Sequence, residues 1–201
     1  MSAARFSRGE LERFNGATVD DLIGGRTRLL FVGINPGLWT AAVNAHFARP
    51  GNRFWPALHQ AGIVVSPVDA RDGMSEAERR MVLDAGIGIT NLVPTASARA
   101  DELTSHDLRD GGERLVALVE RLEPKVVAVL GITAYRVAFE RRAALAGRQD
   151  DNIAGAELWV LPNPSGLNAH DTIASLAAAY REAAVAAGVS LGADTSGRGR
   201  G

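Results

Sequence analysis

The sequence predicts a single-domain α/β sandwich, in which helices cover both faces of a mainly parallel sheet of roughly four strands. Short apolar runs of the kind that form buried strands recur at 28–32, 87–93, 126–130 and 158–161. Segments with helix-start signals or helical periodicity separate these runs, and such alternation is typical of a parallel sheet. With 201 residues, 46% of them hydrophobic, the chain can bury a complete core in one domain.

The N-terminal half of the chain is expected to supply two strands with helices between them. The first strand, at 28–32, ends at a Gly/Asn/Pro cluster that breaks regular structure. A short helix is expected at 52–60. A further helix begins after a capping box formed by Ser75 and Glu78. Residues 87–93 then form the second strand.

The C-terminal half continues the alternation. Thr104 or Ser105 caps a longer helix, and Pro124 ends it. The apolar face of that helix consists of Leu108, Leu115, Val119 and Leu122. The continuous apolar run at 126–130 is of the type that parallel sheets bury on both faces.

A helix at 133–141 and a strand at 158–161 complete the sheet, and Asp171 caps a final Ala-rich helix that continues to about Ala187. Residues 1–16 are expected to be a tail or a short helix. Residues 17–189 would form the α/β domain, and the Gly-rich, polar residues 190–201 a disordered tail.

Charge is distributed unevenly along a nearly neutral chain. The formal net charge is −1, which argues against a protein that coats nucleic acid through bulk charge. However, no acidic residue lies between Asp21 and Asp69. That window holds Arg26, Arg28, His46, Arg49, Arg53 and His59. A local basic face suits an anionic ligand bound at one small site, such as a few DNA phosphates, and the less favoured alternative is chance clustering in an Arg-rich chain.

Several classes of site are excluded or unsupported by composition. The chain has no Cys, which excludes disulfides, thiol nucleophiles and iron–sulfur clusters. The four His residues show no paired helical spacing, so no metal site is expected. No apolar run approaches ~20 residues, and we expect a soluble, cytoplasmic and monomeric protein without a membrane partner.

Two loops carry most of the functional signal: Gly33-Ile34-Asn35-Pro36-Gly37 and Asn163-Pro164-Ser165-Gly166-Leu167. Each follows an apolar strand, and ligands of open α/β sheets bind at the carboxyl ends of strands. Pro36 restricts the backbone after Asn35, whose side chain can accept a hydrogen from water but cannot take up a proton as a carboxylate does. The alternative for an isolated Asn-Pro-Gly is a turn Asn that bonds its own backbone.

The second loop is stiffened by proline and presents Leu167 near its tip. Such a side chain can act as an apolar wedge that holds a duplex open while a nucleotide is extruded. Alternatively, Leu167 folds back onto the helix that follows Asp171.

Three motifs together resemble one family. Residues 33–37 (G-I-N-P-G), 46–55 (H-F-A-R-P-G-N-R-F-W) and 161–167 (L-P-N-P-S-G-L) look like the mismatch-specific uracil-DNA glycosylase and thymine-DNA glycosylase family of the uracil-DNA glycosylase superfamily. The resemblance runs in order from Arg28 to Ala184. It implies hydrolysis of the N-glycosidic bond of a flipped uracil or thymine opposite guanine, in double-stranded DNA, without metal or cofactor.

The resemblance also implies roles for individual residues. Asn35 matches the residue that positions water, Phe47 the aromatic that stacks on the base, Ile34 the pocket lining, Asn163 the start of the wedge loop, and Gly166 and Leu167 the wedge. Ser165 lies in that loop, and Arg49 and Arg53 are candidates for phosphate contacts, although Arg53 can instead pair within its own helix. His46 either bonds substrate or phosphate, or is a solvent-facing loop residue. Phe54 and Trp55 are expected in the core.

Some positions depart from the family pattern. Asn168-Ala169 replace Ser-Arg, which puts contacts to the unpaired guanine in doubt. Thr40 stands where the family has a smaller residue and can crowd a 5-methyl group, which favours uracil over thymine. Neither motif has the Asp and His of the superfamily's fast uracil enzymes. We therefore expect a slower enzyme that depends on a weakened base pair.

The only Lys, Lys125, begins a strand and is therefore expected at the end of the sheet opposite the two motifs. A glycosylase that also cuts the backbone generally needs an amine for a Schiff base, so a monofunctional enzyme is predicted. Two alternatives remain open: a glycosylase for another lesion, such as ethenocytosine, hypoxanthine or xanthine, and a non-catalytic module that binds damaged DNA.

Overall fold

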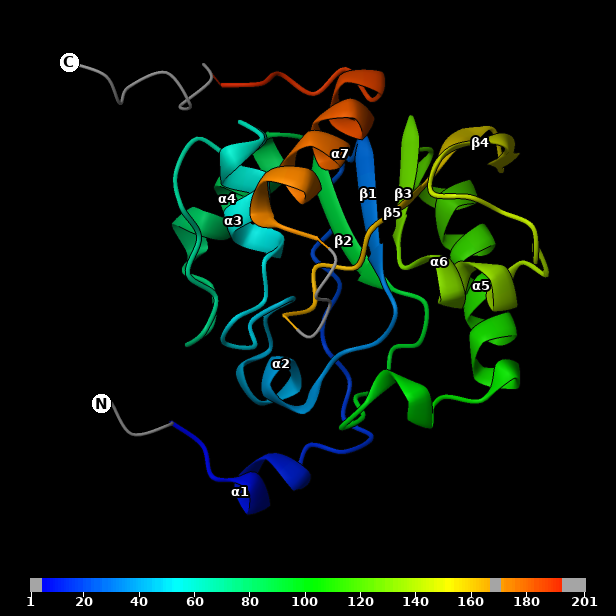
Figure 1. Ribbon diagram of the computed structural model, residues 1–201. Helices are drawn as coiled ribbons and strands as arrows, with labels where there is room; N and C mark the ends of the chain where they lie inside the picture. The colour runs from blue at the N-terminus through cyan, green and yellow to red at the C-terminus, as the bar shows by residue number, and fades with distance from the viewer. Residues whose placement is uncertain (1–4, 167–170, 193–201) are drawn as a thin grey trace.

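The computed structural model describes residues 5–166 and 171–192. A five-stranded sheet lies at its centre, with helices on both sides (Figure 1). The strands are β1 (Leu29–Gly33), β2 (Ile87–Asn91), β3 (Val126–Leu130), β4 (Gly147–Ile153) and β5 (Ala156–Leu161), in the spatial order β2-β1-β3-β5-β4. All neighbouring pairs are parallel except β4 and β5. The predicted α/β sandwich is confirmed, with one strand more than expected.

Helices form the two outer layers. They are α1 (Arg8–Glu12), α2 (Leu38–Val43), α3 (Phe54–Gln60), α4 (Glu76–Asp84), the 3-10 helix η1 (Ala100–Glu102), α5 (Ser105–Leu122), α6 (Ile132–Ala138) and α7 (Ile173–Ala186). Figure 1 shows α3, α4 and α7 on one side of the sheet and α5 and α6 on the other. None of the helices in the described part of the chain is long and apolar enough to span a membrane.

The central strands are buried on both faces, which explains their continuous apolar sequences. Leu29 and Phe31 of β1 belong to the core under α3 and α7, whereas Leu30 and Val32 belong to the core under α5 and α6. Alternate residues of a strand point to opposite faces, so both sets must be apolar in a covered parallel sheet. Phe54 is 0% exposed, and its burial confirms the prediction that it belongs to the core.

Two predicted helix starts are confirmed. Ser75 caps α4 in a reciprocal capping box with Glu78, and Thr104 caps α5 in the same way with Asp107. The predicted start of the last helix was wrong by one residue. Thr172, not Asp171, is the cap of α7, and its side chain accepts from the Ser175 N–H at 3.1 Å.

The unpredicted strand is β4, whose sequence G-R-Q-D-D-N-I is mostly polar. It lies at the edge of the sheet, paired only with β5 within the described chain, and most of its residues are partly or fully exposed. An edge strand of this kind needs little apolar surface, so it gives no hydrophobic signal in the sequence.

The ends of the chain are described only in part. Residues 8–12 form α1, within the segment expected to be a tail or a short helix. Of the predicted C-terminal tail, residues 190–192 are described, and the Gly192 N–H donates to the Gly62 carbonyl at 2.8 Å. Residues 193–201 lie outside the described residues.

The parallel strands place several loops at one edge of the sheet. The first motif loop follows β1, residues 92–104 follow β2, and the second motif loop follows β5. Because the carboxyl ends of parallel strands meet at the same edge, segments far apart in the sequence are brought together there.

Candidate active site

A cavity of about 600 Å³ opens at this edge of the sheet. It lies within the range of roughly 300–1,000 Å³ found for small-molecule sites. Its lining comes from residues 33–37, Thr40, His46, Phe47, Arg49, Asn52, Asn91, residues 97–101, Leu130, Asn163 and Ser165. The structure thus brings residues of both motif loops to one cavity, Ile34 and Asn35 from the first and Asn163 and Ser165 from the second, whereas Gly166 is not among the lining residues.

Asn35 has its amide held in one orientation. Its Nδ2 donates to Ser97 Oγ at 2.8 Å and to the Pro36 carbonyl at 3.1 Å, and the Thr95 carbonyl lies 3.4 Å away. A carbonyl oxygen only accepts hydrogen bonds, so the amide atom on this side must be the nitrogen. The acceptor Oδ1 is therefore the amide atom turned away from these partners. Asn35 bonds the adjacent backbone, as expected for a turn Asn, and it also lines the cavity, as expected for a functional Asn.

Phe47 presents an aromatic ring to the cavity from a strained backbone. Its φ of 55° lies in the left-handed region, which residues other than Gly rarely adopt. The ring stacks on Phe54 with centroids 4.0 Å apart and planes 24° apart. Phe54 therefore packs against one face of the Phe47 ring and limits the orientations that this ring can take. Strain of this kind is often found at ligand sites.

His46 is buried, at 3% exposure, which contradicts the solvent-facing alternative. Its Nε2 lies 3.0 Å from the Asp20 carbonyl and so carries a hydrogen. Burial lowers the pKa of His46, with the nearby Asp21 carboxylate partly opposing it. The ring is therefore neutral, and its Nδ1 is an acceptor.

Asn91 ends β2 and donates from Nδ2 to that acceptor, His46 Nδ1, at 3.4 Å. Its Oδ1 then faces the other way, toward Gly33, where an added Cβ would stand only 2.4 Å from it. His46 thus orients a second amide with its oxygen toward Gly33, and both Gly33 and Asn91 line the cavity. The sequence reasoning missed Asn91, although its place at a parallel strand end, beside the strand that precedes Asn35, is a signal that could have found it.

Thr40 and Ile34 frame the same cavity. Thr40 is 6% exposed and lies in α2, one turn after the first motif loop. Ile34 is half-buried, and its Cδ1 packs over Gly131 at the start of α6. Both are therefore placed to limit the shape of a ligand rather than to react with it.

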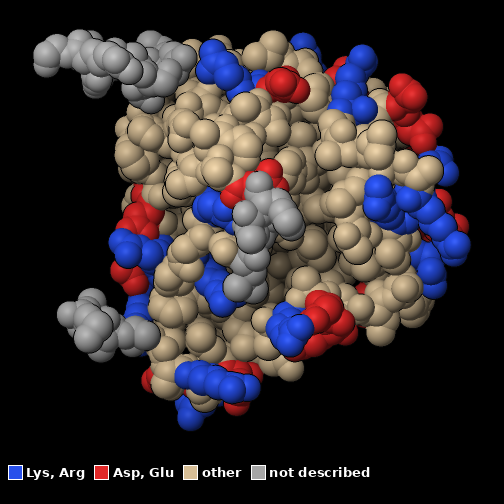
Figure 2. Space-filling model, viewed as in Figure 1, with Lys and Arg blue, Asp and Glu red and all other residues tan. Residues whose placement is uncertain are grey.

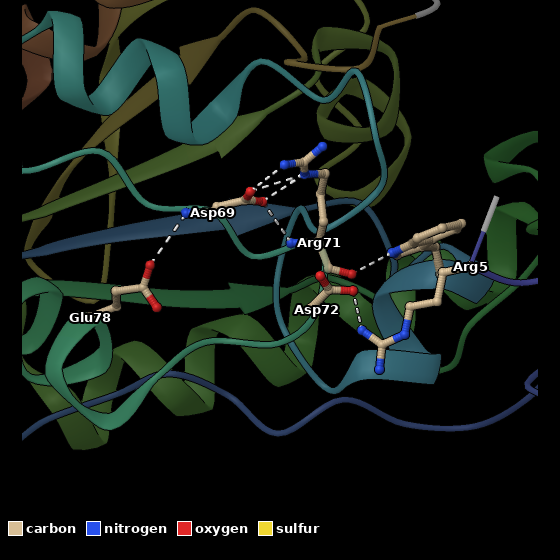
Figure 3. Close-up of polar contacts among 6 residues, drawn as sticks. Arg5, Asp69, Arg71, Asp72 and Glu78 are labelled. Atoms are coloured by element: carbon tan, nitrogen blue, oxygen red, sulfur yellow. Dashed lines mark hydrogen bonds and ion pairs between the residues drawn. The ribbon is translucent and has the colours of Figure 1, made fainter. Parts of the chain in front are cut away.

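Polar contacts with the loop at 69–72 hold α2, the helix that carries Thr40, in position (Figure 3). The neighbouring Trp39 donates its indole N–H to the Arg71 carbonyl at 3.0 Å. Arg71 is in turn paired with Asp69, and Asp72 is paired with Arg5 of the N-terminal segment. These exposed ion pairs contribute little stability individually, but they fix the loop against which Trp39 rests.

The second motif loop is tied down by its own side chains and by α3 and α7. Asn163 Oδ1 accepts from the Ser165 N–H at 2.9 Å, and Tyr180 donates to the Pro162 carbonyl at 3.1 Å. Arg53 donates its backbone N–H to the Pro164 carbonyl at 3.0 Å. Residues 162–165 are therefore held in place beside the cavity.

The Arg53 guanidinium also serves this loop. It donates to the Ser165 carbonyl at 2.5 Å and to the Asp171 carbonyl. These contacts indicate that Arg53 holds the loop in place, and they argue against a contact between Arg53 and phosphate. Arg49, in contrast, is exposed on the rim of the cavity, where a phosphate can reach it.

The wedge is described only up to Gly166. A Cβ added to Gly166 would stand 2.6 Å from the Gly51 carbonyl, so a larger residue cannot replace it without moving the backbone. Leu167 and Asn168 lie outside the described residues.

The face seen in Figure 2 carries interspersed basic and acidic side chains, which agrees with the low net charge.

Comparison with known proteins identifies the family. The model of the uracil DNA glycosylase superfamily matches residues 21–185, which is more than half of the chain. The chain belongs to the uracil DNA glycosylase superfamily. Its fold is similar to the solution structure of a candidate uracil DNA glycosylase from Methanosarcina acetivorans, with a TM-score of 0.58 at 17% identity. That alignment covers 82% of this chain and 96% of the other.

As a member of this superfamily, the chain has DNA as its implied substrate. The described residues contain no group of three or more His, Cys, Asp or Glu side chains that could hold a metal ion. Asp101 is the acidic residue among those that line the cavity, and Arg99 pairs with it at 2.5 Å. Lys125 immediately precedes β3, at the opposite end of the sheet from the cavity, as predicted.

Proposed function

We propose that this protein is a monofunctional DNA glycosylase that extrudes uracil mispaired with guanine and hydrolyses its N-glycosidic bond, thereby initiating base excision repair. Thymine and ethenocytosine opposite guanine are further candidate substrates. The observation that carries the proposal is the fixed amide of Asn35, whose oxygen is turned from three acceptors while the residue lines the cavity.

Loss of a pyrimidine passes through an oxocarbenium-like sugar and a base anion. Water must then attack the sugar carbon, and an amide oxygen can orient it by accepting one of its hydrogens. Asn35 Oδ1 suits that task because the amide cannot turn without facing its oxygen toward two carbonyl oxygens. An amide takes up no proton, so the reaction depends on a base that leaves largely unaided.

The cavity supports recognition of a pyrimidine. Phe47, backed by Phe54, offers a ring on which an extruded base can stack. Asn91 Oδ1 is an acceptor suited to the N3–H of uracil or thymine. Cytosine and ethenocytosine have no N3–H, so ethenocytosine would have to bind without this hydrogen bond. Thr40 narrows the same space, which favours uracil over its 5-methyl derivative.

The position of the single lysine supports hydrolysis without strand cleavage. A lyase step needs an amine that forms a Schiff base with the abasic sugar. Lys125 lies at the wrong end of the sheet for that step. Product DNA is therefore expected to remain intact until alkali is added.

The proposal is tested by single-turnover base release from matched duplexes that carry G·U, A·U, G·T and G·ethenocytosine, with alkali added afterwards to reveal abasic sites. Release is expected to be fastest from G·U, slower from A·U, and to give no strand break before alkali. Strand cleavage that survives Lys125→Ala would contradict the monofunctional assignment. Absence of release from all four duplexes, together with tight binding to an abasic duplex, would support a binding module or a different lesion instead.

A further inference from the structure

Ser97 lies in the loop after β2, 62 positions from Asn35 in the sequence, and touches it directly. Ser97 is 9% exposed and lines the same cavity. Its backbone is fixed as well, because the Ser97 N–H donates to the Pro36 carbonyl at 3.2 Å. The hydroxyl is thus held beside the first motif loop by the chain on both sides of the contact.

The direction of each hydrogen bond at Ser97 is determined by its partners. A hydroxyl has one hydrogen, and Ser97 Oγ donates it to the Arg99 carbonyl at 2.7 Å. Toward Asn35, 2.8 Å away, the oxygen must then accept, so only Nδ2 fits there. The result is a directed chain from Asn35 Nδ2 through Ser97 Oγ to the Arg99 carbonyl.

We propose that Ser97 is a positioning residue for the glycosylase reaction, which acts by locking the Asn35 amide with its oxygen toward the attacking water. This inference rests on the proposed function of Asn35. In this role Ser97 acts through Asn35 and takes no direct part in the reaction.

Two physical effects support the role. The final torsion of an Asn side chain is broad and roughly two-fold, so a fixed orientation needs strong partners. The contact to Ser97 is the shortest of the three at Nδ2, and the other two, at 3.1 and 3.4 Å, are weaker. Donation from Nδ2 along a hydrogen-bond chain also polarises the amide and makes Oδ1 a better acceptor.

The test is a double-mutant cycle of Asn35→Ala and Ser97→Ala, measured as single-turnover base release from G·U duplex. Binding of each variant to an abasic duplex is measured in parallel. Ser97→Ala alone is expected to slow release on the order of 10-fold, because one well-formed hydrogen bond is lost. In the Asn35→Ala background it should have almost no further effect, and binding should stay within about twofold of the parent.

Two further variants distinguish positioning from general structural damage. Ser97→Thr keeps the hydroxyl and is expected to recover most of the rate. Thr27→Ala is the matched control, since Thr27 is also a buried hydroxyl that donates to a carbonyl, that of Gly24 at 2.9 Å, and it precedes β1 away from the cavity. It should lower the unfolding temperature without slowing base release.

The outcomes separate the two proposals. If Asn35→Ala leaves the rate unchanged, the proposed function of Asn35 fails. If Asn35→Ala slows release but Ser97→Ala does not, or slows it equally in both backgrounds, Asn35 keeps its role and Ser97 is not its positioning residue. A rate loss shared by Ser97→Thr would also overturn the inference.

Discussion

The two motif loops contain the same dipeptide at equivalent places in the fold. Asn35-Pro36 follows β1 and Asn163-Pro164 follows β5, both at the carboxyl edge of the sheet. Their amides are used in opposite ways. Asn35 donates from its amide nitrogen to Ser97 and to main-chain carbonyls, whereas Asn163 accepts with its amide oxygen from the Ser165 N–H. On the proposed function, Asn35 Oδ1 is the acceptor for water, whereas Asn163 Oδ1 stabilises the turn of its own loop.

This difference shows that an Asn-Pro pair at a strand end does not by itself indicate chemistry. The role follows from which neighbours surround the amide. At Asn35 two of the three acceptors, Ser97 Oγ and the Thr95 carbonyl, come from another loop, whereas Asn163 Oδ1 accepts from a residue two positions further along its own loop.

The comparison is tested most strongly by truncating each amide. Asn35→Ala is expected to slow single-turnover base release by roughly 10²–10⁴-fold while DNA affinity is nearly kept, because the water loses its orienting acceptor. Asn163→Ala should slow release far less and act mainly on thermal stability and DNA affinity. Equal rate losses for the two variants would show that both amides take part in chemistry.

Gly33→Ala probes the second oriented amide. The new Cβ would stand 2.4 Å from Asn91 Oδ1 and 3.3 Å from Phe47 Cζ, so both must move. Displacement of about 1 Å in a site can cost on the order of 10²-fold, and we expect a loss of that size in single-turnover rate. Gly25→Ala is the control, since its Cβ meets nothing within 4 Å and the residue precedes β1, away from the cavity. Full activity of Gly33→Ala would remove Asn91 from base recognition.

Arg53→Lys addresses the anchoring of the second loop. A lysine cannot reproduce the forked donation of Arg53 to the Ser165 and Asp171 carbonyls. Loss of a hydrogen bond from a charged donor costs about 1.5–3 kcal/mol, and a decrease of this order in the unfolding free energy is expected from denaturant titration. The exposed Arg49→Lys should leave stability unchanged and weaken DNA binding instead. A stable Arg53→Lys with weakened DNA binding would favour the phosphate contact.

The smallest effect is expected from the pH dependence of stability. Burial lowers the pKa of His46 from 6.5, so the folded protein binds fewer protons than the unfolded chain between the lowered pKa and 6.5. This contribution to stability is complete above pH 6.5 and is lost as the pH falls toward the lowered pKa. Denaturant midpoints measured from pH 7.5 to 5 should show this decline. It should persist in His106→Gln, which alters an exposed histidine, and weaken in His46→Gln.

Much of the fold could be predicted from the sequence. Capping boxes at Ser75 and Thr104 and doubly buried apolar runs are local signals, and these elements formed where expected. The prediction failed where the local signal was weak. The edge strand β4 is polar, and Asp171 and Thr172 are both good caps, so only the path of the chain chose between them.

The location of the candidate site was predicted from the sequence, but the prediction left out some of the residues that line it. The order of strands and helices already indicated that Asn35 and Asn163 lie at one edge, and motif resemblance added Phe47 and His46. Asn91 and Ser97 were missed because neither lies in a motif. Arg53 was expected near phosphate or in its own helix, and its contacts to the second loop depend on residues more than a hundred positions away.

The order of amino acids establishes which residues are apolar, which runs form strands, and which side chains can donate or accept hydrogen bonds. The folding of the chain then decides which end of each amide faces its hydrogen-bonding partners. That decision depends on acceptors brought together from separate loops, such as Ser97 and the Thr95 carbonyl beside Asn35. The nitrogen and oxygen of an amide are nearly equal in size, so their placement follows from hydrogen-bonding partners and not from shape or local propensity.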